Sequence, residues 1–182
     1  VYRPQCEGCR ACVPVRVPVE RFRPDRRQRR CLRANADLEI TERGPEFDPE
    51  HFALFERYLA ARHAGGGMDQ PTREDYLGFI RADWSDTLLY EFRLKDRLLA
   101  VAVVDRLPDA LSAVYTFFEP AGSRRGLGRH AVLSEIRLAR EAHLKWLYLG
   151  YWISGCAKMR YKNEYRPLEY LGPGGWSETP PA

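Results

Sequence analysis

Three cysteines near the start of the chain have the spacing of a metal site. Cys6, Cys9 and Cys12 form a C-x-x-C-x-x-C pattern, Cys31 follows, and Cys156 lies far away. Gaps of two residues let successive thiolates converge on one zinc ion or iron–sulfur cluster. Five cysteines, three of them tightly spaced, are a poor fit to a secreted disulfide framework. The pattern therefore predicts a zinc or iron–sulfur site, with Cys31 or an upstream residue as fourth ligand. Unliganded thiols are the alternative.

The same part of the chain is strongly basic. Residues 1–33 hold ten arginines and three acidic residues, a net charge of +7, whereas the whole chain carries +4. Guanidinium groups displace condensed counterions and present a planar fork to phosphate oxygens. The block therefore indicates contact with nucleic acid, and a solvated arginine-rich edge is the alternative.

A third group of residues could bind an anion. The segment Ser123-Arg-Arg-Gly-Leu-Gly128 places Gly126 and Gly128 at the start of a helix expected over residues 127–142. Such glycines let backbone N–H groups at a helix N-terminus approach an anion.

Periodicity and turn residues predict the elements that must position these groups. Helices are expected over residues 26–38, from Asp48-Pro49 to His63 with Gly65–Gly67 ending it, and from a capping box at Thr72–Asp75. Strands are expected over residues 88–94, 98–105, 111–118 and 146–152, with a hairpin at Lys95-Asp96. Residues 13–19, with two prolines, are expected to form an edge strand, and the tail from residue 172 is expected to fray.

The order of two helices, three antiparallel strands, a helix and a strand resembles the acyl-CoA N-acyltransferase fold. The expected fold class is α+β: a mixed, mainly antiparallel sheet flanked by helices and preceded by a Cys-rich basic segment. The glycine segment stands where that fold holds pyrophosphate, with Ser123 in place of the usual Arg or Gln. We expect a basic Cys-rich region over residues 1–38, an acyltransferase-like domain over 39–171 and a flexible tail over 172–182.

Two stretches in the C-terminal half carry a narrower resemblance. They are VVDRLPDALSAVYTFFEP over residues 103–120 and YLGYWI with KMRYKNEYRP over residues 148–167, and Tyr2-Arg-Pro4 precedes the cysteines. Together they resemble the aminoacyl-tRNA–protein transferase family, the bacterial aspartate/glutamate leucyltransferases more than the eukaryotic arginyltransferases. The resemblance implies transfer of leucine or arginine from charged tRNA to the N-terminal amine of proteins that begin with Asp or Glu, which creates an N-degron. Family members have a further segment before Tyr-Arg-Pro, so a chain that starts at Val1 is expected to lack it.

The resemblance implies a site where an amine attacks an aminoacyl ester. The N-terminal ammonium must lose a proton, and Asp105, at the end of a strand, is the candidate that holds or deprotonates it. Capping of the turn that follows is the alternative for Asp105. Tyr115, Tyr148 and Tyr151 are candidates to stabilise the oxyanion of the tetrahedral intermediate, and a place in the core is their alternative.

An acidic acceptor also needs a partner for its carboxylate. A basic and aromatic cluster near the C-terminus is expected to bind either that carboxylate or the tRNA acceptor end, with a solvated loop as the alternative. Arginines around the glycine segment are expected to contact tRNA phosphate. The residues concerned are Lys158, Arg160, Tyr161, Lys162, Tyr165 and Arg166 in the cluster, and Arg124, Arg125 and Arg129 around the glycines.

Length and composition limit the remaining classes. The 182 residues, 45% hydrophobic and 30% charged, are typical of a globular chain with one domain. No apolar run approaches the roughly 20 residues of a membrane helix, and no secretory signal is visible. We expect a cytoplasmic monomer that needs no cofactor for transfer and has no membrane partner. The alternatives are an acyl-CoA-dependent N-acetyltransferase, a non-catalytic RNA- or metal-binding module, and an inactive fragment.

Overall fold

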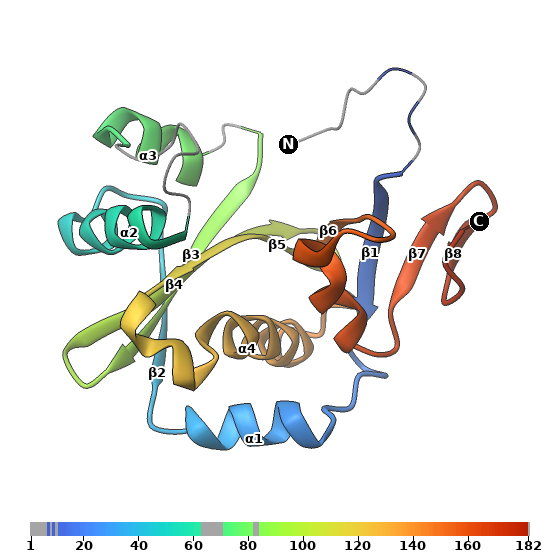
Figure 1. The fold of residues 1–182 in the computed structure, drawn as a ribbon, viewed down its shortest axis with the longest axis horizontal. Helices are drawn as coiled ribbons and strands as arrows, with labels where there is room; N and C mark the ends of the chain where they lie inside the picture. Colours follow the sequence, from blue (N-terminus) through green and yellow to red (C-terminus); the bar gives the residue numbers. More distant parts are fainter. Residues whose placement is uncertain (1–6, 8, 10, 63–70, 82–83, 182) are drawn as a thin grey trace.

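A single mixed sheet organises the part of the chain that the structure describes. The structure is a computed structural model, and it describes residues 7, 9, 11–62, 71–81 and 84–181. The sheet has eight strands in the order β2-β3-β4-β5-β6-β1-β7-β8 (Figure 1). The strands are β1 (Val13–Pro18), β2 (Glu39–Arg43), β3 (Asp86–Leu94), β4 (Arg97–Leu107), β5 (Ala110–Phe118), β6 (Trp146–Trp152), β7 (Glu169–Gly172) and β8 (Gly175–Ser177). The helices are α1 (Arg26–Ala34), α2 (Pro49–Arg62), α3 (Arg73–Ile80) and α4 (Leu127–Glu141), with 3₁₀ segments η1 (Pro120–Arg125) and η2 (Ala157–Glu164).

Helices cover both faces of this sheet. α1 and α4 lie along one face, and α2 and α3 lie along the other (Figure 1). Ala100, Ala102 and Val104 of β4 belong to the core on the α4 side, whereas Val101 and Val103 belong to the core on the α2 side. This double burial explains why β4 is continuously apolar rather than alternating. Among the described residues, no helix is long and apolar enough to cross a membrane.

The predicted helix starts are confirmed where the structure describes them. Asp48 Oδ1 accepts hydrogen bonds from the backbone N–H of Glu50 at 2.7 Å and of His51 at 3.4 Å, which caps α2. Thr72 and Asp75 form the expected reciprocal capping box at α3. The expected end of α2 at residues 63–67 lies outside the described residues.

The four expected strands are β3 to β6, and the helix expected over residues 127–142 is α4. The first helix is shorter than expected. It begins at a capping box between Asp25 and Gln28, but it ends at Ala34 rather than Leu38. Asn35 takes a non-helical conformation there and donates from Nδ2 to the Arg125 carbonyl at 2.8 Å, a tertiary contact that helical periodicity does not reveal.

The prediction of an edge strand near the N-terminus is wrong. β1 lies inside the sheet, between β6 and β7. β6 pairs with β1 along most of its length, whereas β7 pairs only at Val15 and Arg16. Pro14 and Pro18, which have no N–H to donate, flank this short second ladder. The prolines therefore limit the pairing with β7 without excluding it.

The C-terminal tail, expected to fray from residue 172, is instead paired up to residue 177. β7 and β8 form a hairpin that closes between Gly172 and Gly175. Arg16 anchors this hairpin to the sheet, because its Nε donates to Glu169 at 2.8 Å. Its guanidinium also lies between the rings of Trp146 (3.5 Å) and Trp176 (4.1 Å). Partners about 150 residues apart in the chain hold the tail in place.

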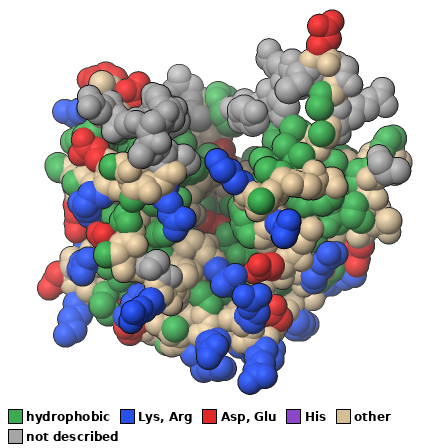
Figure 2. All heavy atoms as spheres, viewed as in Figure 1, with side chains coloured by type: hydrophobic (Ala, Val, Ile, Leu, Met, Phe, Trp, Pro, Cys, Tyr) green, Lys and Arg blue, Asp and Glu red, His purple; other side chains and the backbone are tan. Residues whose placement is uncertain are grey.

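The basic N-terminal region joins the same core as the rest of the chain. β1 belongs to the common sheet, and Cys31 of α1 is buried in the same core as Leu127 of α4. Lys and Arg side chains gather along the lower side of Figure 2, where Figure 1 places α1.

One residue of α4 makes the fold sensitive to pH. Glu135 is completely buried, and neither of its carboxyl oxygens has a hydrogen-bond partner among the described residues. Burial raises the pKa of the Glu135 carboxyl to about 8. Because the unfolded chain releases this proton near pH 4.5, stability is lost as the pH rises from there towards 8.

We therefore expect Glu135→Gln to stabilise the protein at pH 7 by about 2 kcal/mol and to change stability little at pH 4.5. The carboxyl that Gln replaces is uncharged in the folded protein at pH 4.5 and equally without partners among the described residues, so the gain arises from the ionisation cost at higher pH. Urea unfolding at the two pH values measures the difference. Glu141→Gln, at an exposed site on the same helix, is the matched control. An equal effect of Glu135→Gln at both pH values would contradict the prediction.

Candidate functional site

The site lies where two neighbouring strands separate. β5 and β6 pair in parallel only over Ala110–Ser112 and Trp146–Tyr148. Beyond this point the register of β5 against β4 shifts, which leaves Val114 as an extra residue in β5. Such a bulge bends a strand away from its neighbour. In β6, Gly150 has a φ of 72°, a left-handed conformation that suits glycine.

Two pockets open at this separation. The α4 pocket, of about 800 Å³, is formed by α2, β5, the start of α4, and η2. The β4 pocket, of about 840 Å³, is formed mainly by α3, β4, β6 and η2. Ala113, Val114, Leu149 and Tyr161 line both, so the pockets meet between the separating strands.

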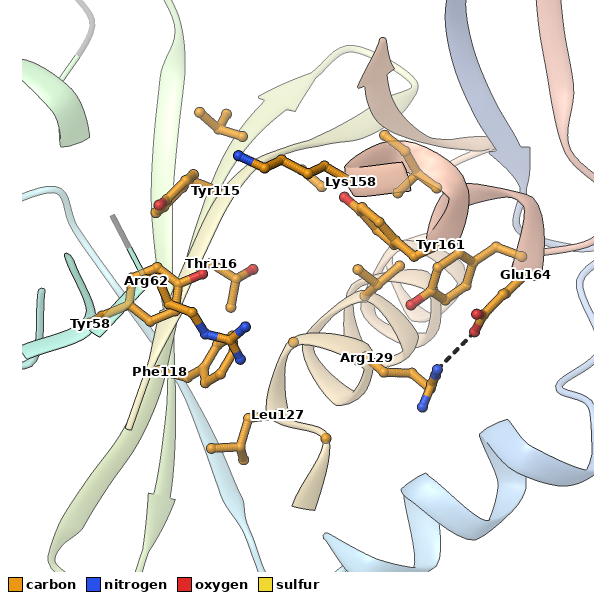
Figure 3. Close-up of a pocket in the computed structure, with 17 residues that line it drawn as sticks. Tyr58, Arg62, Tyr115, Thr116, Phe118, Leu127, Arg129, Lys158, Tyr161 and Glu164 are labelled. Carbon is orange, nitrogen blue, oxygen red and sulfur yellow. Dashed lines mark hydrogen bonds and ion pairs between the residues drawn. The ribbon is translucent and has the colours of Figure 1, made fainter. Parts of the chain in front are cut away.

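The α4 pocket is lined by basic and aromatic side chains. In Figure 3, Tyr58, Arg62 and Tyr115 lie on one side, and Arg129 and Tyr161 lie on the other. Lys158 extends across the pocket towards Tyr115 (Figure 3). Burial, with a further contribution from Tyr58, raises the pKa of the Tyr115 hydroxyl above its usual value, so Tyr115 is a neutral phenol at pH 7.

The glycine segment forms the end of the α4 pocket. Gly126 and Gly128 both line it, and Gly126 has a φ of 64°. A Cβ at Gly128 would lie 3.2 Å from the Phe118 ring, so a larger residue would crowd this wall. α4 begins without a side-chain cap. Its first N–H groups therefore carry the partial positive charge of a helix N-terminus into the pocket wall.

The three arginines around the glycines have different surroundings. Arg129 lines the α4 pocket and donates to Glu164 at 2.9 Å, as the dashed line in Figure 3 marks. Arg125 forms a two-pronged ion pair with Asp37, at 2.8 and 2.9 Å, and lines neither pocket. Hydrogen bonding from Arg125 lowers the pKa of Asp37. Arg124 is exposed and also lies outside both pockets.

Asp105 lies in the wall of the β4 pocket. It is largely buried, and its Oδ1 accepts hydrogen bonds from Ser85 Oγ at 2.9 Å and Thr87 Oγ1 at 2.7 Å. These two hydroxyls orient the carboxylate, and within the described residues Oδ2 has no hydrogen-bond partner. The Asp105 carboxylate thus bonds to Thr87 in β3 and to Ser85 just before β3, rather than capping the turn after β4. Ser85 and Thr87 were not predicted from the sequence.

Lys162 is the buried cation of the β4 pocket, whose lining also includes the exposed Arg81, with its Nε donating to the Pro45 carbonyl at 2.8 Å. The Lys162 ammonium donates to the backbone carbonyl of Tyr151. Burial lowers the pKa of Lys162 to about 8, although Cys156 acts in the opposite direction. The side chain is therefore mostly protonated at pH 7, and a carboxylate beside it would be stabilised. A Cβ at Gly150 would lie 3.8 Å from Nζ, so the glycine leaves room beside the ammonium.

The remaining predicted residues are divided between the pockets and the surface. Tyr148 and Tyr151 line the β4 pocket, whereas Tyr115 lines the α4 pocket, so the three tyrosines do not form one group. Arg160 is exposed and lies outside both pockets. Arg166 also lies outside them and donates to the Asn163 carbonyl at 3.0 Å. The sequence analysis missed Tyr58 and Arg62, since nothing in the pattern of α2 links it to this pocket.

The cysteines are only partly described. Cys6 lies outside the described residues, Cys9 is exposed, and Cys12 is half-buried and lines the β4 pocket. Cys31 does not suit the role of fourth ligand. Its thiol points at the Arg125 and Gly126 carbonyls, at 3.7 and 3.6 Å, and burial raises its pKa, which disfavours the thiolate that a metal needs. The two-residue gap between Cys9 and Cys12 still suits a shared metal.

Comparison with protein families and curated proteins gives consistent matches. The family model described as "Arginine-tRNA-protein transferase, C terminus" matches residues 50–172, and its N-terminus counterpart matches residues 1–30. An aspartate/glutamate leucyltransferase of Pseudomonas syringae pv. tomato is 51% identical over 176 residues, which are 97% of this chain and 75% of that protein. The protein of the same name from Hahella chejuensis is 49% identical over 175 residues, or 96% of this chain and 75% of its own length.

Comparison with solved structures confirms the expected fold. The C-terminal domain of a putative lysylphosphatidylglycerol synthetase from Agrobacterium fabrum is similar with a TM-score of 0.57, 13% identity, and coverage of 79% of this chain and 47% of that chain. FemX is similar with a TM-score of 0.54, 12% identity, and coverage of 80% and 54%. The chain has the expected acyltransferase-like mixed sheet flanked by helices. At these identities, the likeness concerns the fold alone.

Proposed function

The chain belongs to the arginine-tRNA-protein transferase family, and we propose that it moves a leucyl group from leucyl-tRNA to the N-terminal amine of proteins that begin with Asp or Glu. Membership makes it an aminoacyltransferase, and the proposal assigns its two pockets to its two substrates. The observation that carries this assignment is the junction of the pockets at Ala113, Val114, Leu149 and Tyr161. A donor in one pocket and an acceptor in the other would meet there.

The α4 pocket suits the 3′ end of the donor tRNA. The uncapped start of α4 and Arg129 suit phosphate oxygens, and the rings of Tyr58 and Tyr161 suit stacking with a base. The junction itself is lined mainly by small and apolar side chains, which supports a leucyl rather than an arginyl group there. The acidic side chain in the same wall, Glu164, is paired with Arg129, so its charge is already offset there.

The β4 pocket suits an acidic N-terminal residue. Such a residue carries an α-ammonium and a side-chain carboxylate, and the pocket presents the carboxylate of Asp105 and the buried ammonium of Lys162, with the exposed Arg81 as a second cation. Asp105 would hold the ammonium, and Lys162 would pair with the carboxylate. A buried carboxylate needs such a charged partner to offset the loss of water.

The reaction needs little covalent help from the protein, because the donor ester is already activated. Asp105 takes a proton from the ammonium, and the amine then attacks the ester carbonyl carbon. A C–N bond forms, the ester C–O bond breaks, and the ribose hydroxyl leaves with a proton. Placing both reactants in contact can supply roughly 7–11 kcal/mol of the barrier. Tyr115, Tyr148 and Tyr151 remain candidate donors to the oxyanion, and no cofactor enters these steps.

The proposal extends to the setting of the enzyme. We infer a monomer that acts in the cytoplasm, on tRNA and protein substrates in solution. We also propose a zinc ion or iron–sulfur cluster at Cys6, Cys9 and Cys12 with a structural role. Because Cys12 lines the β4 pocket, such a site would order the edge of that pocket. No transfer step goes through it.

Transfer from purified leucyl-tRNA and arginyl-tRNA tests the function directly. We expect leucine to be attached to peptides that begin with Asp or Glu, and not to an otherwise identical peptide that begins with Ala. Mass spectrometry of the peptides measures the product. Absence of transfer from both tRNAs would refute the proposal. Acetylation of the same peptides from acetyl-CoA would favour an N-acetyltransferase, and tRNA binding without transfer would favour a non-catalytic RNA-binding module.

A further inference from the structure

The outer face of α1 is unusually rich in unpaired positive charge. Five of the nine residues of α1 are arginines, at positions 26, 27, 29, 30 and 33, and the helix contains no acidic residue. All five are exposed. Among the described residues, none forms an ion pair with a carboxylate, and only the side chain of Arg29 makes a hydrogen bond, to the Pro24 carbonyl.

Among the described helices, α1 alone carries five arginines without a carboxylate partner. Arginines nearby are paired, as in Arg125 with Asp37, Arg129 with Glu164 and Arg137 with Glu141. On α1, arginines three and four positions apart lie beside one another, and like charges at these spacings destabilise a helix by about 0.2–0.5 kcal/mol per pair. The cost is removed when a polyanion covers the face.

The inner face of α1 is fastened to the rim of the α4 pocket. Gln28 donates to the Glu164 carbonyl at 2.8 Å, and the Cys31 thiol contacts the Gly126 carbonyl at 3.6 Å. Glu164 and Gly126 both line the α4 pocket, on η2 and at the start of α4. α1 therefore joins two sides of that rim, and its basic face is about one helix diameter, roughly 10 Å, from it.

We propose that the outer face of α1 binds phosphates of the tRNA acceptor stem while the 3′ end enters the α4 pocket. This inference rests on the proposed function and adds the part of the tRNA that docks outside the pocket. The blue side chains along the lower side of Figure 2 follow α1 and continue towards α4. An anionic membrane is a poorer fit, because an interfacial helix needs an exposed apolar face and α1 turns Cys31 and Leu32 into the core.

A charge-matched pair of variants tests the proposal. One variant replaces Arg26, Arg30 and Arg33 with Gln, which preserves helix propensity. The control replaces Arg43, Arg106 and Lys145 with Gln. These three exposed residues lie at the end of the sheet where β3, β5 and β6 begin, and they line neither pocket. Arg106 and Lys145 form surface ion pairs, and Arg43 lies 3.6 Å from Glu91, which keeps His51 and Arg93 as further partners. Circular dichroism and thermal melting verify that both variants fold.

Fluorescence anisotropy with leucine tRNA measures binding independently of transfer. We expect the α1 variant to bind about tenfold or more weakly at 0.15 M salt, and the slope of log affinity against log salt to fall by about 2 to 3. The control variant should behave as wild type. Transfer from a leucylated CCA trinucleotide, which has no stem, should be the same for all three proteins.

Equal tRNA affinity and salt slope in the α1 variant, the control and the wild type would overturn the proposal. An equal loss with the trinucleotide and with tRNA would also overturn it, because the arginines would then act on the pocket. Failure of the wild type to transfer leucine from either donor would instead refute the proposed function, and the anisotropy measurement would still decide the role of α1.

Discussion

Asp105→Asn is expected to lower kcat for leucyl transfer by about a thousandfold, within the range of roughly 10²–10⁴ that a positioned general base supplies. The substitution preserves the shape of the side chain, and its Oδ1 can still accept from Ser85 and Thr87. The amide cannot take a proton from the α-ammonium, so loss of activity would arise from chemistry rather than unfolding. Steady-state transfer to an Asp-initiated peptide measures the effect.

Asp109→Asn is the matched control for this substitution. Asp109 is an exposed aspartate four residues further along, in the turn between β4 and β5, and it pairs with Lys145 rather than lining a pocket. It should retain wild-type activity. A second variant, Thr87→Val, removes one of the hydroxyls that orient Asp105, and it should lower kcat less than Asp105→Asn. Wild-type kcat in Asp105→Asn would remove this residue from the mechanism.

The second large effect is expected at Lys162. Lys162→Met removes the ammonium and retains a similar apolar stem. Since the acceptor carboxylate would then lose its buried partner, and Arg81 is exposed and already bonded to the Pro45 carbonyl, kcat/KM for Asp- and Glu-initiated peptides should fall about a hundredfold. An Asn-initiated peptide should be affected much less, so the preference for acidic over amide side chains should collapse. Lys145→Met, at an exposed lysine outside both pockets, is the control.

The pH dependence provides an independent measure of Lys162. Its pKa of about 8 means that the charge is present below this pH and is lost above it. In the wild type, kcat/KM for an Asp-initiated peptide should therefore fall as the pH rises beyond about 8, whereas Lys162→Met should lack this descending limb. An unchanged preference for acidic peptides together with an unchanged pH profile would contradict the assignment.

Local sequence signals predicted much of the fold because they act within a few residues. The capping box of Thr72 and Asp75 and the Asp48 cap lie within one helical turn. The apolar run of β4 predicts a strand that is buried on both faces, and this prediction does not depend on which elements cover it. The placement of Gly126 and Gly128 between a strand and a helix followed from the same local reasoning, and both glycines line a pocket.

The partners of Asp105 show where such reasoning ends. Counting back from the turn at Lys95-Asp96, where Leu94 pairs with Arg97, an unbroken ladder would place Asp86 opposite Asp105. An irregularity between Phe92 and Arg93 shifts the register by one residue and brings Thr87 opposite instead. A carboxylate opposite Asp105 would repel it, whereas the threonine hydroxyl bonds to it. One extra residue in a strand thus decides the electrostatics of the pocket.

The sequence by itself determined the chemical groups of this protein: an acid at the end of one strand, a cluster of cations and tyrosines after another, glycines at a helix start and a block of arginines. The tertiary structure alone decided which of these groups lie in the same pocket and which are paired elsewhere. The separation of β5 from β6 places Asp105 and Lys162 in one pocket and Arg129 and Lys158 in the other. Asp37 pairs with Arg125, and Glu169 pairs with Arg16. Pairing across such distances depends on how strands and helices pack, which no local spacing encodes.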